Sequence, residues 1–475
     1  MIVNVHAIRS PGAAAAELEA GLARLRTMTR RKGIALSGVA LQLALLAACA
    51  SAPPAPLAPD VEAALRGPDL AVLTRDAATF AHPALKPVAI DFDRPLTPDA
   101  LAIIAVIANP DLKAARAKAK VVGAQAFDAG LLPDPILTLG FDKLLSGPDA
   151  LNGVSALIAQ DLVALRDRAV VRARDKAAAR HVRLDLAWQE WQTAGQARLL
   201  AARIDGLTRT AALNDETRAA ADDMLRRVLA AAARGDLKAD EVEARRIAAV
   251  DAADKATTAR RDLNTARHAL SALLGLPPET SLAVAAPTTD TAALDADALF
   301  RRARMQRLDL AALEAGYASQ NASVRKAVLD TFSGLLLTVG RSNDTTGNHI
   351  LNSQVAFALP VWNAGRGGVA IALATRDQLR AEYAARVFAT RADVAELVSQ
   401  IVLEQREREV VRDQLAALRP LADAAERAAM RGDVSLAAAG AARQSVADKA
   451  LLLATLEQAI GEQHAALQIA VGGPL

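Results

Sequence analysis

The chain has 475 residues, of which 52% are hydrophobic but only 3% aromatic, and its formal net charge is +3. Alanine supplies much of the apolar content, and sequence of this kind favours long, closely packed helices. Residues 1–48 carry six Arg or Lys and two Glu, so the remainder of the chain is nearly neutral at −1. No basic patch is interleaved with aromatic residues, and we therefore expect no nucleic-acid partner.

The first 48 residues are predicted to be an N-terminal extension and a lipoprotein signal peptide. Arg30-Arg31-Lys32 is a basic start, and the apolar stretch from Ile34 to Ala48 is too short to span a bilayer. It leads into Leu46-Ala47-Ala48-Cys49, which resembles the bacterial lipobox, and Cys49 is the only cysteine. We expect Cys49 to be the lipid attachment site, acylated on its thiol and its amine. The alternative is a lone buried cysteine in a soluble protein.

The residues around Cys49 also predict where the protein is located. Ala50 follows the cysteine, which in lipoproteins implies export to the outer membrane. Residues 49–96 are predicted to be a lipid-anchored tether, rich in Ala, Ser and Pro over 50–60. Met28 directly precedes the basic start, so the sequence leaves open whether residues 1–27 are translated.

The second half of the chain resembles the first at a spacing of 197 to 200 residues. The matching segments are Ala100-Leu101 with Ala298-Leu299, Leu137-Thr138-Leu139-Gly140 with Leu337-Thr338-Val339-Gly340, and Arg234-Gly235-Asp236 with Arg431-Gly432-Asp433. Their common spacing predicts two structural repeats, over residues 97–290 and 291–475.

Each repeat is predicted to open with a helix and to continue into a β-hairpin. Thr97-Pro98-Asp99 supplies an N-cap, a proline at the first helical position and an acid in the first turn. This helix is expected to run to about Ala129, before Gly130 and two prolines break it. The strands are expected within about 135–160 in repeat 1 and about 335–359 in repeat 2.

The returning strand of the second hairpin has the alternation of a transmembrane barrel strand. One face carries Leu351, Val355, Phe357 and Leu359, with Ser353 among them, and the other carries Asn352, Gln354, Ala356 and Ala358. Apolar residues facing lipid and small or polar residues facing a lumen would produce this pattern. An amphipathic hairpin on a soluble sheet would produce it too. Its occurrence in both repeats, together with the outer-membrane signal, favours the barrel.

A long helical hairpin is predicted after each β-hairpin, over 163–276 and 366–472. There is no proline from Asp161 to Leu276, and the first arm, Val163 to Arg234, would be about 108 Å long. Pro420 is expected to mark a kink in the second tract. In each Arg-Gly-Asp, the glycine is suited to end one helix and the aspartate to begin the next.

Four strands cannot close a membrane barrel, because open strand edges are not tolerated in lipid. The chain must then oligomerise, as a dimer with about eight strands or a trimer with about twelve. About eight strands fill their own lumen with side chains, whereas about twelve leave a passage, so a conduit favours the trimer.

From about Thr97 to the C-terminus, the chain resembles the TolC-like outer-membrane factors, the exit ducts of tripartite efflux pumps and type I secretion systems. The segment from Leu359 to Gly367 looks like the family's crossing from barrel to helices, with Pro360, Gly365 and Arg366 at the bend. The corresponding segment of repeat 1, Gln160 to Arg166, lacks the proline and the glycine. The resemblance implies a fold that is mainly α with a small β part: a trimeric 12-stranded outer-membrane β-barrel continued by a long α-helical barrel.

The resemblance also assigns roles to residues of the helical hairpins. The turns at Arg234-Gly235-Asp236 and Arg431-Gly432-Asp433 would be periplasmic tips that contact the adaptor. Asp240, Glu241 and Glu243 would form an acidic ring at the tunnel aperture and favour cations. The alternative for these acids is a solvated helix face that pairs with Arg245 and Arg246.

An enzyme is not expected, and neither is a cofactor or a metal site. The six histidines are scattered without metal-ligand spacing, and no phosphate-binding glycine loop is present. The resemblance implies a passive duct from periplasm to exterior, working with a periplasmic adaptor and an inner-membrane transporter of the resistance-nodulation-division type. The alternative is a periplasmic helical lipoprotein scaffold that forms no pore. The sequence does not name the exported substrate.

Overall fold

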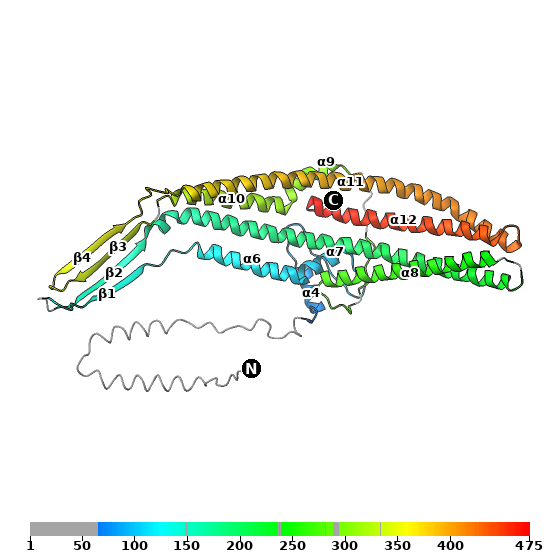
Figure 1. Cartoon of the computed structure of the whole chain (residues 1–475), viewed down its shortest axis with the longest axis horizontal. Helices are drawn as coiled ribbons and strands as arrows, with labels where there is room; N and C mark the ends of the chain where they lie inside the picture. Colours follow the sequence, from blue (N-terminus) through cyan, green and yellow to red (C-terminus); the bar gives the residue numbers. More distant parts are fainter. Residues whose placement is uncertain are drawn as a thin grey trace, which may run out of the picture. The chain divides into compact units, whose positions relative to one another are not determined.

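The computed structural model describes residues 65–147, 151–235, 237, 239–280, 282–287, 294–332 and 334–475. Cys49 and Asp236 lie outside the described residues, as do the predicted signal segment and the tether up to residue 64. Within residues 65–475 the described chain is mainly helical, with one small sheet (Figure 1). This confirms the predicted fold class in its coarse form.

The elements follow one another in two runs of the same order. After α4 (Leu70–Ala78), the first run is α5 (Pro98–Ala108), α6 (Pro110–Asp128), β1 (Ile136–Asp142), β2 (Gly153–Asp161), α7 (Leu162–Ala232) and α8 (Ala239–Leu273). The second run is α9 (Ala296–Gln306), α10 (Leu308–Leu329), β3 (Leu336–Asn343), β4 (His349–Ala356), α11 (Arg366–Arg431) and α12 (Leu436–Val471).

The predicted helix from Thr97 to Ala129 is in fact two helices. Thr97 caps α5 as expected, because its hydroxyl accepts the backbone N–H of Ala100 at 3.2 Å. The chain then leaves the helical conformation at Asn109, whose ψ is 126°, because the proline that follows disfavours helical geometry there. Asn109 starts α6 by accepting the N–H of Leu112 at 2.9 Å, so the single-helix prediction was wrong at this residue.

The proline-free tract forms the long helix that the sequence predicted. Helix α7 has 71 residues and α11 has 66. Pro420 lies inside α11, which continues through it although the proline has no N–H for the carbonyl of Ala416. No helix within the described residues is long and apolar enough to span a membrane.

The strands form one antiparallel sheet in the order β1-β2-β3-β4. The central pairing, β2 with β3, joins the two runs of elements, with Ile158 opposite Val339. In Figure 1 the sheet lies at one end of the long helices, and the α7–α8 and α11–α12 turns lie at the other end. Strands β1 and β4 form the open edges of the sheet in the single chain.

The main core surrounds α5, which is buried along nearly its whole length against α7. Trp188 and Trp191 of α7 are buried, and the guanidinium of Arg307 lies 4.6 Å from the centre of the Trp188 ring. In the segment between α4 and α5, His82 contacts α7, where its Nε2 lies 3.1 Å from the carbonyl oxygen of Ala187. Burial lowers the pKa of His82, so the ring is neutral at pH 7.

Two polar side chains, one in each run of elements, bind the C-terminal ends of α8 and α12 in the same manner. The Nδ2 of Asn109 donates to the carbonyl of Leu273 at 2.9 Å, at the end of α8. The Nη1 of Arg307 donates to the carbonyl of Ala470 at 2.9 Å, near the end of α12. Each side chain directly precedes α6 or α10, and each satisfies a carbonyl that the last helical turn leaves without a partner.

Candidate functional site

The strand register separates the sheet into an apolar face and a small or polar face. Residues directly opposite each other on neighbouring strands lie on the same side of a sheet. The apolar face carries Leu137, Leu139, Phe141, Val154, Ala156, Ile158, Gln160, Leu337, Val339, Arg341, Asn343, His349, Leu351, Ser353 and Val355. The polar face carries Thr138, Gly140, Asp142, Gly153, Ser155, Asp161, Thr338, Gly340, Ser342, Asn352 and Gln354, with Ile136, Leu157, Ala159, Leu336, Ile350 and Ala356.

On the inner strands the two faces also differ in exposure, whereas on the edge strand β1 Ile136 of the polar face is as exposed as Leu137 of the apolar face, at 61%. Along β2, the apolar-face residues Val154 and Ile158 are 52% and 55% exposed, whereas Gly153 and Ala159 of the polar face are buried. On the polar face, the Nδ2 of Asn352 donates to the Oγ of Ser342 at 2.7 Å. The register places Leu351 and Val355 on one face and Asn352, Gln354 and Ala356 on the other, as the sequence predicted.

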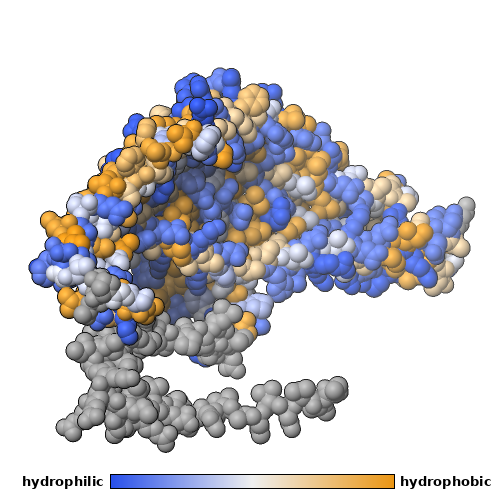
Figure 2. Space-filling model, turned by 60° about the vertical axis from the view of Figure 1, so that its left-hand side comes forward, coloured by the Kyte–Doolittle hydropathy of each residue, from blue (hydrophilic) through white to orange (hydrophobic). Residues whose placement is uncertain are grey.

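Hydrophobic residues are thus exposed where a soluble sheet would be covered. In Figure 2 they are most continuous on the left-hand side, which is the end that carries the sheet in Figure 1. Leu139 is 60% exposed, Phe141 55% and Leu351 80%. A continuous exposed apolar surface of this kind marks a contact with lipid or with another protein.

The crossing from β4 into α11 uses the residues that the sequence singled out, but the strand ends earlier than expected. Strand β4 stops at Ala356, the partner of Leu336, because β3 begins there and later residues have no partner in the sheet. Pro360 therefore lies in the connecting segment. Gly365 precedes α11 in the left-handed conformation, with φ of 66°, and Arg366 is the first residue of the helix. A side chain at Gly365 would also approach Thr331 to within 2.9 Å.

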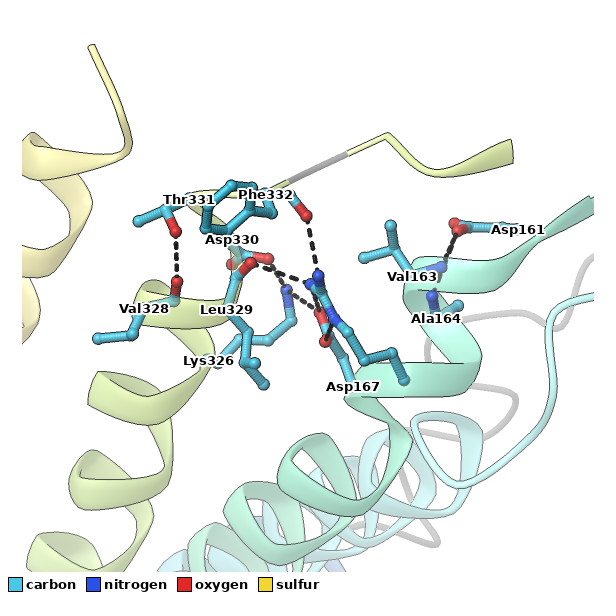
Figure 3. Close-up of polar contacts among 11 residues, drawn as sticks. Asp161, Val163, Ala164, Asp167, Lys326, Val328, Leu329, Asp330, Thr331 and Phe332 are labelled. Atoms are coloured by element: carbon cyan, nitrogen blue, oxygen red, sulfur yellow. Dashed lines mark hydrogen bonds and ion pairs between the residues drawn. The ribbon is translucent and has the colours of Figure 1, made fainter. Parts of the chain in front are cut away.

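The crossing from β2 into α7 needs neither proline nor glycine, because one aspartate ends the strand and begins the helix. Asp161 is the last residue of β2, and its Oδ1 accepts the N–H groups of Val163 and Ala164 at 2.8 and 3.2 Å (Figure 3). This arrangement satisfies two of the free donors at the helix start.

Directly beyond this crossing, a buried carboxylate connects α7 to the end of α10. Asp167 is 1% exposed and lies 2.7 Å from Arg166 and 3.3 Å from Lys326 of α10 (Figure 3). Lys326 also pairs with Asp330. Burial alone would raise the pKa of Asp167, but hydrogen bonds and charges from Arg166 and Lys326 outweigh it and hold the pKa below its usual value.

Arg166 links these charged side chains to the backbone at the end of α10. Its Nη1 donates to the carbonyl of Phe332 and its Nη2 to the carbonyl of Leu329, both at 3.0 Å. Leu329 is the last residue of α10 and Phe332 lies three residues beyond it, so Arg166 binds the chain where α10 ends; the Leu329 carbonyl also accepts the N–H of Phe332 at 3.1 Å. We call Arg166, Asp167, Lys326 and Asp330 the crossing cluster. Sequence reasoning missed it, because an adjacent Arg-Asp pair gives no sign of a partner some 160 residues away.

The two predicted tip turns both place their glycine in the left-handed conformation. The φ of Gly235 is 85° and that of Gly432 is 82°. After Gly432, the N–H of Asp433 bonds to the carbonyl of Ala428 at 2.9 Å, which is a Schellman end to α11. The expectation that Asp433 begins the next helix was wrong. Ser435 caps α12 instead, and Asp433 pairs with Arg431 at 2.9 Å.

The predicted aperture residues stand at the start of α8. Asp240 and Glu241 are in its first turn, and Glu243 lies 3.8 Å from Arg246, with both side chains well exposed. Arg245 donates to the carbonyl of Ala437 across to α12 instead. One of the two pairings of the solvated-face alternative is therefore present. No group of three or more potential metal ligands occurs within the described part of the chain.

The described fold is similar to that of solved outer-membrane channels. The chain superposes on the channel OprN with a TM-score of 0.68 and 17% identity, over 86% of this chain and 99% of OprN. For VceC of Vibrio cholerae the TM-score is 0.67 at 16% identity, over 79% and 96% of the chains. For the CmeC channel of Campylobacter jejuni it is 0.68 at 13%, over 79% and 85%. No family model and no curated protein matches the chain in sequence.

The fold of this chain is that of the TolC-like outer-membrane channels. Sequence identities of this size establish the fold alone.

Proposed function

We propose that the chain is the outer-membrane channel of a tripartite efflux system. Three copies would close their sheets edge to edge, β4 of one against β1 of the next, into a barrel of about twelve strands. The long helices would continue the passage through the periplasm. Cys49 would anchor each copy to the outer membrane through its acyl chains.

The two-faced open sheet carries this proposal. Its exposed apolar face suits lipid, and its small or polar face suits a water-filled lumen. Glycine and serine recur on the lumen side, as Gly140, Ser155, Gly340 and Ser342, and small side chains leave room in a barrel of this size. Both edges need a partner strand, because unpaired backbone groups are not tolerated in lipid.

We infer two structural repeats, over 97–290 and 291–475, that arose by duplication. The matched order of elements and the left-handed Gly235 and Gly432 support them. Asn109 and Arg307 support them further, because these two residues are 198 apart and cap carbonyls that are 197 apart. These offsets equal the spacing of the sequence matches.

The partners follow from the same proposal. The tips at Arg234, Gly235 and Asp236, and at Arg431, Gly432 and Asp433, would contact a periplasmic adaptor. The adaptor would join the channel to an inner-membrane transporter of the resistance-nodulation-division type. Substrate would move passively, since the work is done by the transporter.

A pore-free helical scaffold is the competing function. It would keep its strands in water, where the exposed leucines and Phe141 of the apolar face would promote aggregation. The scaffold explains the long helices but gives no reason for this face, so we favour the channel.

Charge reversal at the proposed aperture tests both the channel and its acidic aperture. Replacing Glu241 and Glu243 with lysine in every copy of a trimer changes the aperture by about twelve elementary charges, which should lower cation preference severalfold. The measurement is the reversal potential of the purified channel in planar bilayers under a salt gradient. Asp262→Lys, exposed on the same helix far from the tip, is the control and should resemble the wild type.

The outcomes separate the two parts of the proposal. Conductance with unchanged selectivity would refute the acidic aperture but leave the channel. Absence of any conductance in the wild-type protein would refute the channel itself.

A further inference from the structure

The apolar face of the sheet contains one permanently charged side chain among the strand residues. The register places Arg341 of β3 on this face, opposite Ala156 of β2 and Leu351 of β4. Leu139 of β1 is in the same row, so Arg341 is surrounded by apolar side chains. Leu351 is 80% exposed and Arg341 is also exposed, so neither is covered by another part of the described chain.

Arg341 has no partner in the described part of the chain, where its side chain makes neither a hydrogen bond nor an ion pair. Two carboxylates lie at this end of the sheet, those of Asp344 and Asp142, and neither pairs with Arg341. Asp344, in the β3–β4 loop, accepts four hydrogen bonds from Thr346 and Asn348, which lower its pKa to about 2. Asp142 lies opposite Gly153, on the other face of the sheet.

Arg341 lies near the loop end of the sheet. It lies two residues before the end of β3 and about 17 Å along the strand from Leu336, on the side of the β3–β4 loop. The next row toward the loop is polar on β3 and β4, where Asn343 Oδ1 and His349 Nδ1 are 2.6 Å apart. The flexible stem of an arginine can lie along apolar surface while its head reaches this polar level.

A guanidinium has five N–H donors and no acceptor, and it stays charged at any working pH. At a lipid-facing position near the loop end, its hydrogen-bond acceptors lie outside the protein. The anion at the surface of a membrane is the phosphate of a lipid headgroup, and the planar fork of arginine matches two phosphate oxygens. The small Ala156 beside Arg341 leaves space for such a headgroup.

We propose that Arg341 is a binding site for the phosphate of an anionic outer-leaflet lipid, one per copy of the chain. This proposal rests on the membrane-inserted barrel of the proposed function. Arg341 fixes the lipid against the surface formed by Leu139, Ala156 and Leu351. The bound headgroup holds the loop end of the barrel at the membrane surface.

Lipid retention on the full-length oligomer tests the site. The detergent-solubilised wild type and its variants are incubated with bisphosphorylated lipid A or with zwitterionic phosphatidylethanolamine, and bound lipids are counted by native mass spectrometry. The wild type should retain lipid A in preference to phosphatidylethanolamine. Arg341→Leu, which completes the apolar face, should assemble normally and lose at least about tenfold in lipid A affinity. Arg341→Lys, with the charge but without the fork, should fall between the two.

Lys143→Leu is the matched control, because Lys143 is an exposed cation that directly follows β1 at the same end of the sheet. It should bind lipid A within about twofold of the wild type. The proposal is overturned if Arg341→Leu and Arg341→Lys retain lipid A like the wild type, or if the wild type shows no preference for the anionic lipid. It is also overturned if Arg341→Leu weakens the oligomer without changing lipid retention, since Arg341 would then pair with a neighbouring copy.

These results are distinct from failure of the proposed function. If the wild type conducts ions but the Arg341 variants retain lipid A as the wild type does, only the lipid site is refuted. A wild-type protein that never inserts into bilayers refutes the proposed function, and the lipid site with it.

Discussion

Replacing Ile158 with lysine is expected to prevent insertion of the sheet into the membrane. Ile158 lies near the middle of β2 on the apolar face, opposite Leu137 and Val339, and is 55% exposed. A lysine at the midplane of a barrel's lipid face costs about 2–4 kcal/mol per copy, and a trimer would bear this cost three times. The measurement is the fraction of protein that becomes protease-resistant oligomer when it refolds into lipid vesicles.

Ser155→Lys is the matched control, because Ser155 is three residues away on the same strand but on the opposite face. A lysine there would lie in the water-filled lumen, so insertion should stay close to the wild-type level while the conductance shifts toward anions. Equal insertion of Ile158→Lys and the wild type would contradict the assignment of the apolar face to lipid.

Replacing Asp167 with asparagine is expected to destabilise the junction between the sheet and the helices. The substitution removes the buried charge that Arg166 and Lys326 share, and the loss of a hydrogen bond to a charged group costs about 1.5–3 kcal/mol. Arg166 would then be less firmly placed on the carbonyls of Leu329 and Phe332. The thermal unfolding transition of the helices, followed by circular dichroism in detergent, should move to a lower temperature.

Asp330→Asn is the control within the crossing cluster. Asp330 also pairs with Lys326, but its side chain is 44% exposed, so its loss should cost less than about 1 kcal/mol. The pKa of Asp167 is lower in the folded chain than its ordinary value of 3.8, so the unfolded chain takes up a proton first. The contribution of Asp167 is thus present above pH 3.8 and lost as pH falls below it. Equal transition temperatures for the two variants would contradict the role given to Asp167.

Local sequence signals predicted the parts of the fold that depend on neighbouring residues. Thr97 caps a helix, the proline-free tract from Asp161 to Leu276 holds α7 and α8, and the alternation after Leu351 matches the two faces of β4. The break at Pro110 was also readable, because a proline acts on the residue directly before it. The prediction of one helix to about Ala129 did not take this proline into account.

Features that depend on distant residues were beyond the sequence. Strand β4 ends at Ala356 only because β3 begins opposite it, and the β2–β3 pairing joins residues that are 175 to 189 positions apart in the sequence. The cap of α12, by contrast, is a local feature that was misassigned: Asp433 completes the end of α11, and Ser435 caps α12. The crossing cluster needs Lys326 and the end of α10 beside Asp167, which only the folded chain brings together. The aperture acids and the tips remain predictions.

Single-particle imaging of the purified, lipid-anchored protein in detergent tests the central claim most directly. The proposed channel predicts a threefold particle with a band of about 25 Å of apolar barrel and a hollow helical extension of roughly 100 Å. A monomer, or a solid helical bundle with no band and no passage, would contradict the channel and leave the scaffold in its place.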